Sequence, residues 1–107
     1  MTQDIKNLSP AEVAEALNAG TIHLVDVREP AEFDQVSIEG SISLPLSVFH
    51  PDALPPQDDK EIVFMCAGGV RSIKAIELTR AYGREVSAHL APGIRGWLMQ
   101  GLPVISA

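Results

Sequence analysis

The sequence contains a single cysteine and no feature of an exported or membrane-spanning chain. One cysteine among 107 residues excludes a disulfide within the chain and leaves no second thiol for an internal redox cycle. Residues 1–4 lack the basic and then apolar pattern of a signal peptide, and no apolar run approaches ~18 residues. We therefore expect a cytoplasmic protein without a membrane partner.

Positive charge and cofactor motifs are also scarce. The 8 Lys and Arg residues face 14 Asp and Glu residues, and they form no cluster of the kind that neutralises phosphates, so we expect no nucleic-acid partner. The three histidines, His23, His50 and His89, lack the paired spacing of metal ligands. The glycine pair Gly68 and Gly69 lacks the lysine of a phosphate-binding loop. The sequence therefore predicts neither a metal nor a cofactor.

What the chain does contain is an ordinary composition for one folded domain. Hydrophobic residues make up 46% and charged residues 21% of the sequence. A chain of 107 residues buries roughly 60–70% of its unfolded surface in a single core. We expect residues 1–107 to form one domain.

The most informative segment is an apolar run, residues 62–65, that ends at Cys66 and turns through Gly68 and Gly69 into a helix over residues 72–82. The run is typical of a buried strand in a parallel sheet, so Cys66 lies at the carboxyl end of that strand, where ligands bind in such sheets. The two glycines free the backbone to turn several N–H groups inward. The sequence thus predicts an anion-binding concavity around the cysteine sulfur.

Cys66 is predicted to be a thiolate nucleophile. Helix amino-termini and a nearby arginine lower the cysteine pKa from ~8.5 towards ~3.5–7.5. The alternative is an inert, buried cysteine that packs as a small hydrophobic residue. A packed strand, however, has no reason to be followed by two glycines, Arg71 and the start of a helix.

The rest of the chain alternates between helical and strand patterns. A capping box from Ser9 to Glu12 predicts a helix that Gly20 ends. Periodicity and turn residues then predict strands over residues 22–27, 42–44 and 86–90, helices over 30–35 and 93–100, and a surface loop over 51–59. This order indicates an α/β domain with a mainly parallel sheet.

Three further expectations concern side chains. In the helix over 72–82 the spacing places Ala75, Leu78 and Tyr82 on the buried side. Trp97 is expected in the core. Arg28 and Glu32 stand four residues apart across a turn, where their pairing would brace the loop.

The segment 66–72 resembles the active-site loop of the rhodanese, or sulfurtransferase, superfamily. Residues 24–33 and 38–46 are similar to two further signature segments of that family, and residues 93–97 with 101–104 are similar to its carboxyl-terminal segment. Four segments in the same order, over nearly the whole chain, are far more specific than one cysteine-to-arginine spacing. The resemblance implies a five-stranded, mainly parallel sheet with helices on both faces.

The resemblance also implies the chemistry. Four residues separate Cys66 from Arg71, as in sulfurtransferases, whereas related phosphatases and arsenate reductases have a longer loop with five. Cys66 is then the catalytic residue that carries a persulfide between a small sulfur-containing anion such as thiosulfate and an acceptor, which is cyanide, a thiol or a protein sulfur carrier. The loop that binds substrate comprises Ala67, Gly68, Gly69, Val70, Arg71 and Ser72.

Several positions leave alternatives open. Arg71 either contacts an anionic donor or anchors the loop by pairing with a carboxylate such as Asp26, and Asp26 and Arg28 are expected to support the loop. Ser72 either caps the helix or lends its hydroxyl to the loop, and capping is favoured. Ala67 stands where many family members carry Arg or Lys, which weakens the attraction for a dianionic donor. The alternative function is a non-catalytic module that binds partners, and a phosphatase-like or arsenate-reductase-like enzyme ranks third.

Overall fold

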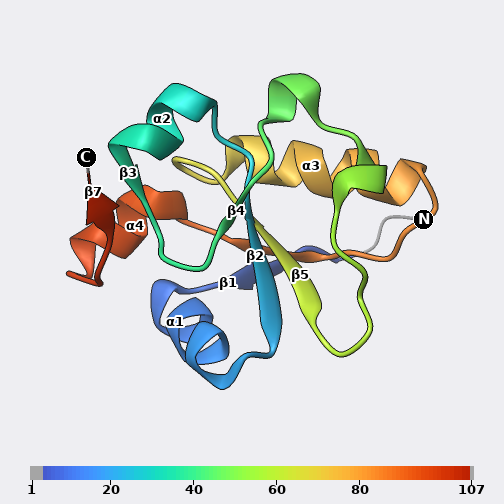
Figure 1. Cartoon of the computed structure of the whole chain (residues 1–107). Helices are drawn as coiled ribbons and strands as arrows, with labels where there is room; N and C mark the ends of the chain where they lie inside the picture. The colour runs from blue at the N-terminus through green and yellow to red at the C-terminus, as the bar shows by residue number, and fades with distance from the viewer. Residues whose placement is uncertain (1–3, 107) are drawn as a thin grey trace.

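A computed structural model describes residues 4–106 and contains one parallel sheet flanked by helices (Figure 1). The sheet has five strands in the order β1-β6-β5-β2-β4, and every pairing in it is parallel. Its strands are β1 (Lys6–Leu8), β2 (Ile22–Asp26), β4 (Ile42–Ser43), β5 (Glu61–Met65) and β6 (Ala88–Leu90). The predicted five-stranded α/β architecture is confirmed.

The remaining elements connect the strands or lie at the carboxyl end of the chain. The helices are α1 (Pro10–Ala19), α2 (Pro30–Gln35), α3 (Val70–Ala81) and α4 (Gly93–Met99). Two 3₁₀ turns, Leu46–Val48 and Pro51–Ala53, lie between β4 and β5, and β3 (Val36–Ser37) pairs antiparallel with β7 (Ile105–Ser106).

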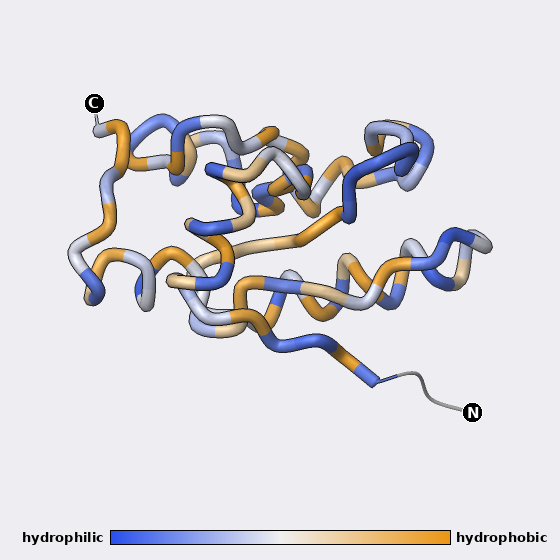
Figure 2. Tube along the Cα trace, turned by 90° about the horizontal axis from the view of Figure 1, so that it is seen from below, coloured by the Kyte–Doolittle hydropathy of each residue, from blue (hydrophilic) through white to orange (hydrophobic). Residues whose placement is uncertain are grey.

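Hydrophobic side chains alternate between the two faces of the sheet, because successive residues of a strand point to opposite sides. Leu24 and Val63 pack with Trp97 and Val13 on the face covered by α1 and α4. Their strand neighbours, which include Phe64, pack instead on the face covered by α3. Hydrophobic and hydrophilic residues also alternate along the helices (Figure 2), as expected where one helix side is buried. Helices therefore cover both faces, and Trp97 lies in the core as predicted.

The first helix begins and ends as the sequence indicates. The Ser9 hydroxyl accepts a hydrogen bond from the Glu12 amide, and the Glu12 carboxylate accepts one from the Ser9 amide. Gly20 ends the helix in the left-handed conformation, with φ of 71°. After this turn the chain enters β2, which lies next to β5, the strand that ends just before Cys66.

Two details of α3 differ from the prediction. The helix begins at Val70, two residues before the predicted start, because Gly69 takes the capping position with φ of 101°. Its buried side contains Ser72, Ala75, Ile76 and Thr79, whereas Leu78 and Tyr82 are exposed. The buried face is therefore rotated towards the side that carries Ser72.

Within residues 4–106 no helix is both long and apolar enough to cross a membrane. Residues 1–3, which belong to the segment where the sequence shows no signal-peptide pattern, lie outside the described residues.

Candidate active site

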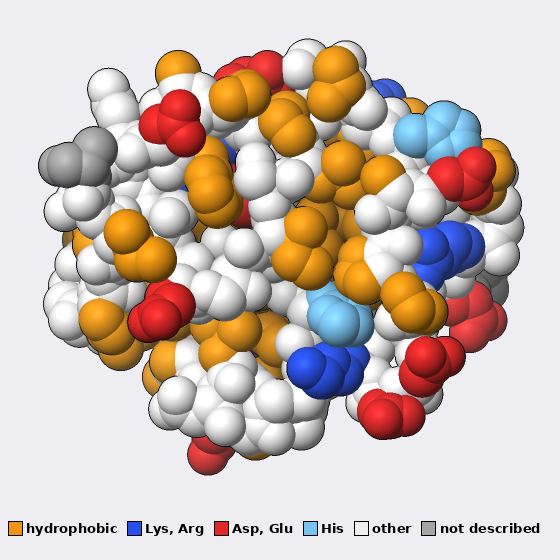
Figure 3. Space-filling model, in the orientation of Figure 1, with side chains coloured by type: hydrophobic (Ala, Val, Ile, Leu, Met, Phe, Trp, Pro, Cys, Tyr) orange, Lys and Arg blue, Asp and Glu red, His pale blue; other side chains and the backbone are white. Residues whose placement is uncertain are grey.

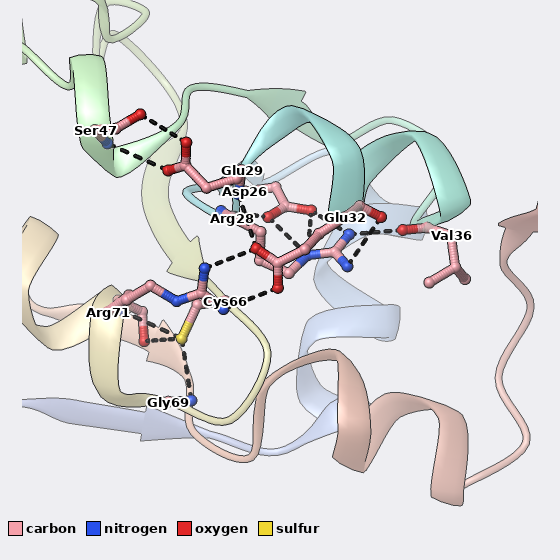
Figure 4. Close-up of polar contacts among 10 residues, drawn as sticks. Asp26, Arg28, Glu29, Glu32, Val36, Ser47, Cys66, Gly69 and Arg71 are labelled. Atoms are coloured by element: carbon pink, nitrogen blue, oxygen red, sulfur yellow. Dashed lines mark hydrogen bonds and ion pairs between the residues drawn. The ribbon is translucent and has the colours of Figure 1, made fainter.

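Backbone amides surround the sulfur of Cys66 at the carboxyl edge of the sheet (Figure 4). Cys66 follows β5 directly, and its Sγ accepts hydrogen bonds from the amide of Gly69 at 3.1 Å and from the amide of Ser72 at 3.4 Å. The Ser72 hydroxyl lies 3.6 Å from the same sulfur. The loop therefore forms the inward-facing ring of donors that its glycines predict.

These donors lower the pKa of Cys66. Burial alone would raise the pKa, because Cys66 is only 1% exposed and a thiolate is poorly solvated there. The Ser72 hydroxyl and the amides of Ser72, Gly69 and Gly68 outweigh burial and lower the pKa below that of a free thiol. The direction agrees with the sequence prediction, but hydrogen bonds to the sulfur are the cause.

The segment that follows β6, residues 91–95, holds the loop in shape. The amides of Ile94 and Arg95 donate to the carbonyls of Cys66 and Ala67 at 2.9 and 3.1 Å, and these bonds tie the loop to α4. A side chain at Gly69 would collide with the carbonyl oxygen of Ala91, and one at Gly93 would collide with the carbonyl of Ala67. Both glycines also have positive φ. Glycine is therefore required at both contact points.

Arg71 anchors the loop to α2. Its guanidinium donates to both carboxylate oxygens of Glu32, at 2.7 and 3.0 Å. This pairing holds the pKa of Glu32 down, to about 2. The structure thus favours the anchoring role of Arg71 over contact with a donor. The prediction that Arg71 pairs with Asp26 is wrong.

Asp26 instead forms a buried pair with Arg28, and that pair places α2. The Asp26 carboxylate accepts hydrogen bonds from the Arg28 amide and guanidinium at 2.8–3.1 Å. The guanidinium also donates to the backbone carbonyls of Val36 and Glu32 at 2.6 and 3.4 Å. The expected contact between the Arg28 and Glu32 side chains is therefore wrong. Arg28 holds the backbone of α2, and Glu32 uses its carboxylate for Arg71.

The Arg71–Glu32 pair predicts a specific dependence of stability on pH. Because the pKa of Glu32 falls from 4.5 in the unfolded chain to about 2 in the folded protein, the pair stabilises the fold above about pH 4.5 and loses this effect towards pH 2. The carboxylate is partly exposed, so the contribution is at most about 1 kcal/mol. Urea unfolding measures this as the difference in free energy of unfolding between the protein and Glu32→Gln, which should shrink as the pH is lowered from about 4.5 towards 2. The difference in free energy of unfolding between the protein and Arg71→Met should shrink in the same way. A difference that does not depend on pH would contradict the pairing of Arg71 with Glu32.

Ser72 belongs to a buried hydrogen-bonded chain rather than to a cap. Its Oγ lies 2.7 Å from Nδ1 of His89 on β6, and Nε2 of His89 lies 2.8 Å from Oδ1 of Asn7 on β1. The predicted capping role of Ser72 is wrong, because Gly69 is the cap and Ser72 is the third residue of α3. His89, which is 2% exposed, was not predicted as part of the site. The available signal was a polar residue between two apolar ones, Ala88 and Leu90, in a strand.

Arg95 was also missed. A side chain on Gly68 would lie 3.2 Å from Nη1 of Arg95, so the guanidinium lies against the loop. Over residues 4–106, the Arg95 side chain forms no hydrogen bond or ion pair. Arg95 thus places a positive charge from α4 beside Gly68 of the loop.

No three metal-ligating side chains lie together in the described part of the chain. The groups that the structure brings together at this site are the Cys66 sulfur, the amides that donate to it and the guanidinium of Arg95 beside Gly68.

Comparison with known proteins defines the family. The rhodanese-like domain family matches residues 9–100. The mitochondrial thiosulfate sulfurtransferase RDL2 of Saccharomyces cerevisiae is 38% identical over 91 residues, which cover 73% of this chain and 61% of that protein. The uncharacterized protein slr1261 of Synechocystis is 36% identical over 104 residues, covering 97% of this chain and 58% of that protein. This chain thus spans about three fifths of these two relatives.

A solved structure agrees in fold. The rhodanese-related protein of Thermoplasma volcanium superposes with a TM-score of 0.79 at 31% identity, covering 94% of this chain and 97% of that one. The chain belongs to the rhodanese-like domain family, and it has sulfurtransferases among its homologues.

Proposed function

We propose that this protein is a sulfurtransferase that carries sulfur as a persulfide on Cys66. The observation that carries the proposal is the pair of backbone amides, of Gly69 and Ser72, that donate to Sγ, with the Ser72 hydroxyl 3.6 Å from the same sulfur. Such donors stabilise the negative charge of a thiolate, and they remain in place for the persulfide that replaces it.

The reaction proceeds in two displacements. The Cys66 thiolate attacks the outer sulfur of thiosulfate, a new S–S bond forms, and the old S–S bond breaks with its electron pair leaving on sulfite. A nucleophilic acceptor then attacks the outer persulfide sulfur and restores the thiolate. No net oxidation occurs, which suits a chain with one cysteine.

The size of the loop supports sulfur over phosphate as the transferred group. Four residues separate Cys66 from Arg71, and Cys66 itself is 1% exposed. Arg71, which would clamp a phosphate, is occupied by Glu32 at 2.7 Å. A single sulfur atom needs less room and less positive charge than a tetrahedral phosphoryl group.

Aryl phosphates should accordingly be turned over negligibly under conditions where thiosulfate and cyanide yield thiocyanate. Both reactions are measured on the same preparation, with Cys66→Ala as the blank. Phosphate release that depends on Cys66 would reverse the ranking of the two chemistries.

Arg95 is the proposed contact for the anionic end of the donor. Arg71 and Arg28 are both paired with carboxylates, whereas Arg95 is exposed and unpaired beside Gly68 among the described residues. A guanidinium in this position attracts a sulfonate group to the mouth of the loop.

Replacing Arg95 by glutamine should raise the KM for thiosulfate several-fold at low ionic strength and leave kcat nearly unchanged. A charge pair at about 6 Å with an effective dielectric of ~80 is worth roughly 0.7 kcal/mol, and added salt screens it. Lys60→Gln removes the same charge at the opposite end of β5 and is the matched control. Equal effects of the two substitutions on KM would show that Arg95 does not face the donor.

The acceptor is proposed to be a thiol or a protein sulfur carrier. Val70 follows Gly69 in the loop and is 80% exposed, so it offers an apolar contact next to the nucleophile. Hydrophobic side chains also gather near the centre of the face that Figure 3 shows, bordered by histidine, basic and acidic side chains. An exposed apolar side chain beside the loop suits a protein acceptor better than cyanide.

The alternative is a non-catalytic module that uses the same fold to bind partners. The nucleophile and its donors count against it, because a binding module needs neither. Persulfide on Cys66 in the purified protein would separate the two functions directly.

A further inference from the structure

A buried chain of hydrogen bonds leads from the nucleophile to the edge strand of the sheet. It runs from Cys66 Sγ to Ser72 Oγ at 3.6 Å, to Nδ1 of His89 at 2.7 Å, and from Nε2 of His89 to Asn7 Oδ1 at 2.8 Å. Cys66, Ser72 and His89 are at most 2% exposed, whereas Asn7 is exposed on β1. A buried thiol is thereby linked to a solvent-facing side chain.

With the Asn7 amide oriented as in the structure, the directions of these bonds follow while Cys66 is a thiol. Asn7 Oδ1 accepts only, so Nε2 of His89 carries the ring hydrogen and Nδ1 accepts. The Ser72 hydroxyl must then donate to Nδ1, and its oxygen is left to accept from the Cys66 thiol. Every donor in this series of hydrogen bonds from Cys66 to Asn7 then faces an acceptor.

Ionisation of Cys66 makes this arrangement unfavourable. A thiolate only accepts, so the single hydrogen of Ser72 then has two acceptors, the sulfur and Nδ1 of His89. One of these buried acceptors would remain unsatisfied. Reversing every bond in the chain removes the conflict.

We propose that His89 exchanges its neutral tautomer when Cys66 ionises, and that it thereby holds the Ser72 hydroxyl on the thiolate. The thiol proton passes to Ser72 Oγ, the former Ser72 hydroxyl proton passes to Nδ1 of His89, and the Nε2 proton leaves to water beside Asn7. Nδ1 then donates to Ser72, which donates to the sulfur. The Asn7 amide, being exposed, turns so that its NH₂ group donates to Nε2. His89 is a positioning residue that acts through Ser72.

The surroundings of His89 suit a neutral ring in both states. Burial lowers the pKa of His89, so the imidazolium is disfavoured near neutral pH. The groups that face the ring are Asn7 from β1, Ser72 from α3, and the backbone of Gly69 from the loop. Arg71 interacts electrostatically with Cys66, but it is paired with Glu32. The contacts described around His89 are thus with neutral groups.

The test is the tautomer of His89, observed through its ring nitrogens by NMR during a pH titration of the ¹⁵N-histidine-labelled protein. The hydrogen should lie on Nε2 below the pKa of Cys66 and on Nδ1 above it, with the midpoint at the thiolate transition seen by ultraviolet absorbance. In Cys66→Ala the switch should disappear. The ring signals of His23 and His50 should not differ between the two proteins and serve as internal controls. A tautomer that stays constant, or that switches equally in Cys66→Ala, would overturn the proposal.

Two substitutions separate a positioning role from a structural one. His89→Leu removes the group that donates to Ser72, so the apparent pKa of Cys66 should rise by about one unit. This rise corresponds to a tenfold smaller thiolate fraction at pH values below the pKa. His89→Asn keeps an amide at the position of Nδ1 that donates or accepts after a flip, and it should restore most of this shift. Equal pKa values in the protein and both variants would contradict the proposal. The inference rests on the proposed function only for the role of the thiolate. Neither the tautomer of His89 nor the pKa of Cys66 is measured with a sulfur donor, so the proposed function can fail while this inference stands.

Discussion

Replacing Cys66 by serine should reduce sulfur transfer from thiosulfate to cyanide to the uncatalysed rate, a loss of at least about 10³-fold in kcat/KM. The hydroxyl of serine has nearly the size of the thiol, but it is not ionised near neutral pH and forms no persulfide. The chain holds no other thiol that would substitute for Cys66. Thiocyanate formation measured over a range of thiosulfate concentrations checks this result.

The control is that the variant keeps its fold. Thermal unfolding of Cys66→Ser should resemble that of the parent protein, because the hydroxyl still meets the amides of Gly69 and Ser72. A folded Cys66→Ser protein that retains more than about 10% of the activity would remove the nucleophile from the mechanism.

The largest effect on stability is expected at the buried pair of Asp26 and Arg28. Their side chains are 0% and 3% exposed, and the closest nitrogen–oxygen distance is 2.8 Å. Asp26→Ala leaves the guanidinium buried without its carboxylate, so the free energy of unfolding should fall by about 3–5 kcal/mol. Urea unfolding near pH 7 measures the change, and far-ultraviolet circular dichroism shows whether the variant still folds.

An exposed ion pair in the same protein provides the comparison. Lys6 and Glu61 approach to 2.9 Å with side chains 54% and 39% exposed, so Glu61→Ala should cost at most about 1 kcal/mol. Combining Asp26→Ala with Arg28→Met should cost less than the sum of the single changes, because no charge then remains buried alone. A loss below about 1 kcal/mol in Asp26→Ala would show that the pair does not hold α2 in place.

The features that the sequence predicts correctly depend on neighbouring residues. The capping box at Ser9 and the strand, glycines and helix around Cys66 are read from spacing alone. The glycine requirement at position 69 is visible for the same reason, although the carbonyl of Ala91 that enforces it is not. Local patterns thus place the nucleophile and most of its donors.

Two contacts that the sequence did not predict join partners that are distant in the sequence. Glu32 and Arg71 are 39 residues apart, and their contact depends on where Arg28 holds α2. The contact of His89 with Asn7 requires the pairing of β6 with β1, a strand of three residues that was too short to predict. No spacing rule connects such pairs.

The misassigned face of α3 has a different cause. Apolar residues occur almost all round this helix, so periodicity does not single out one side. The buried side includes Thr79, whose hydroxyl donates to the Ala75 carbonyl at 2.8 Å and is thereby satisfied in the core. The exposed Leu78 shows that hydrophobicity alone does not fix the face.

The intact mass of the protein after incubation with thiosulfate tests the central claim most directly. The proposed mechanism predicts an increase by one sulfur atom per chain, reversed by cyanide or dithiothreitol and absent in Cys66→Ala. An unchanged mass in the parent protein, or an equal increase in Cys66→Ala, would contradict a persulfide on Cys66.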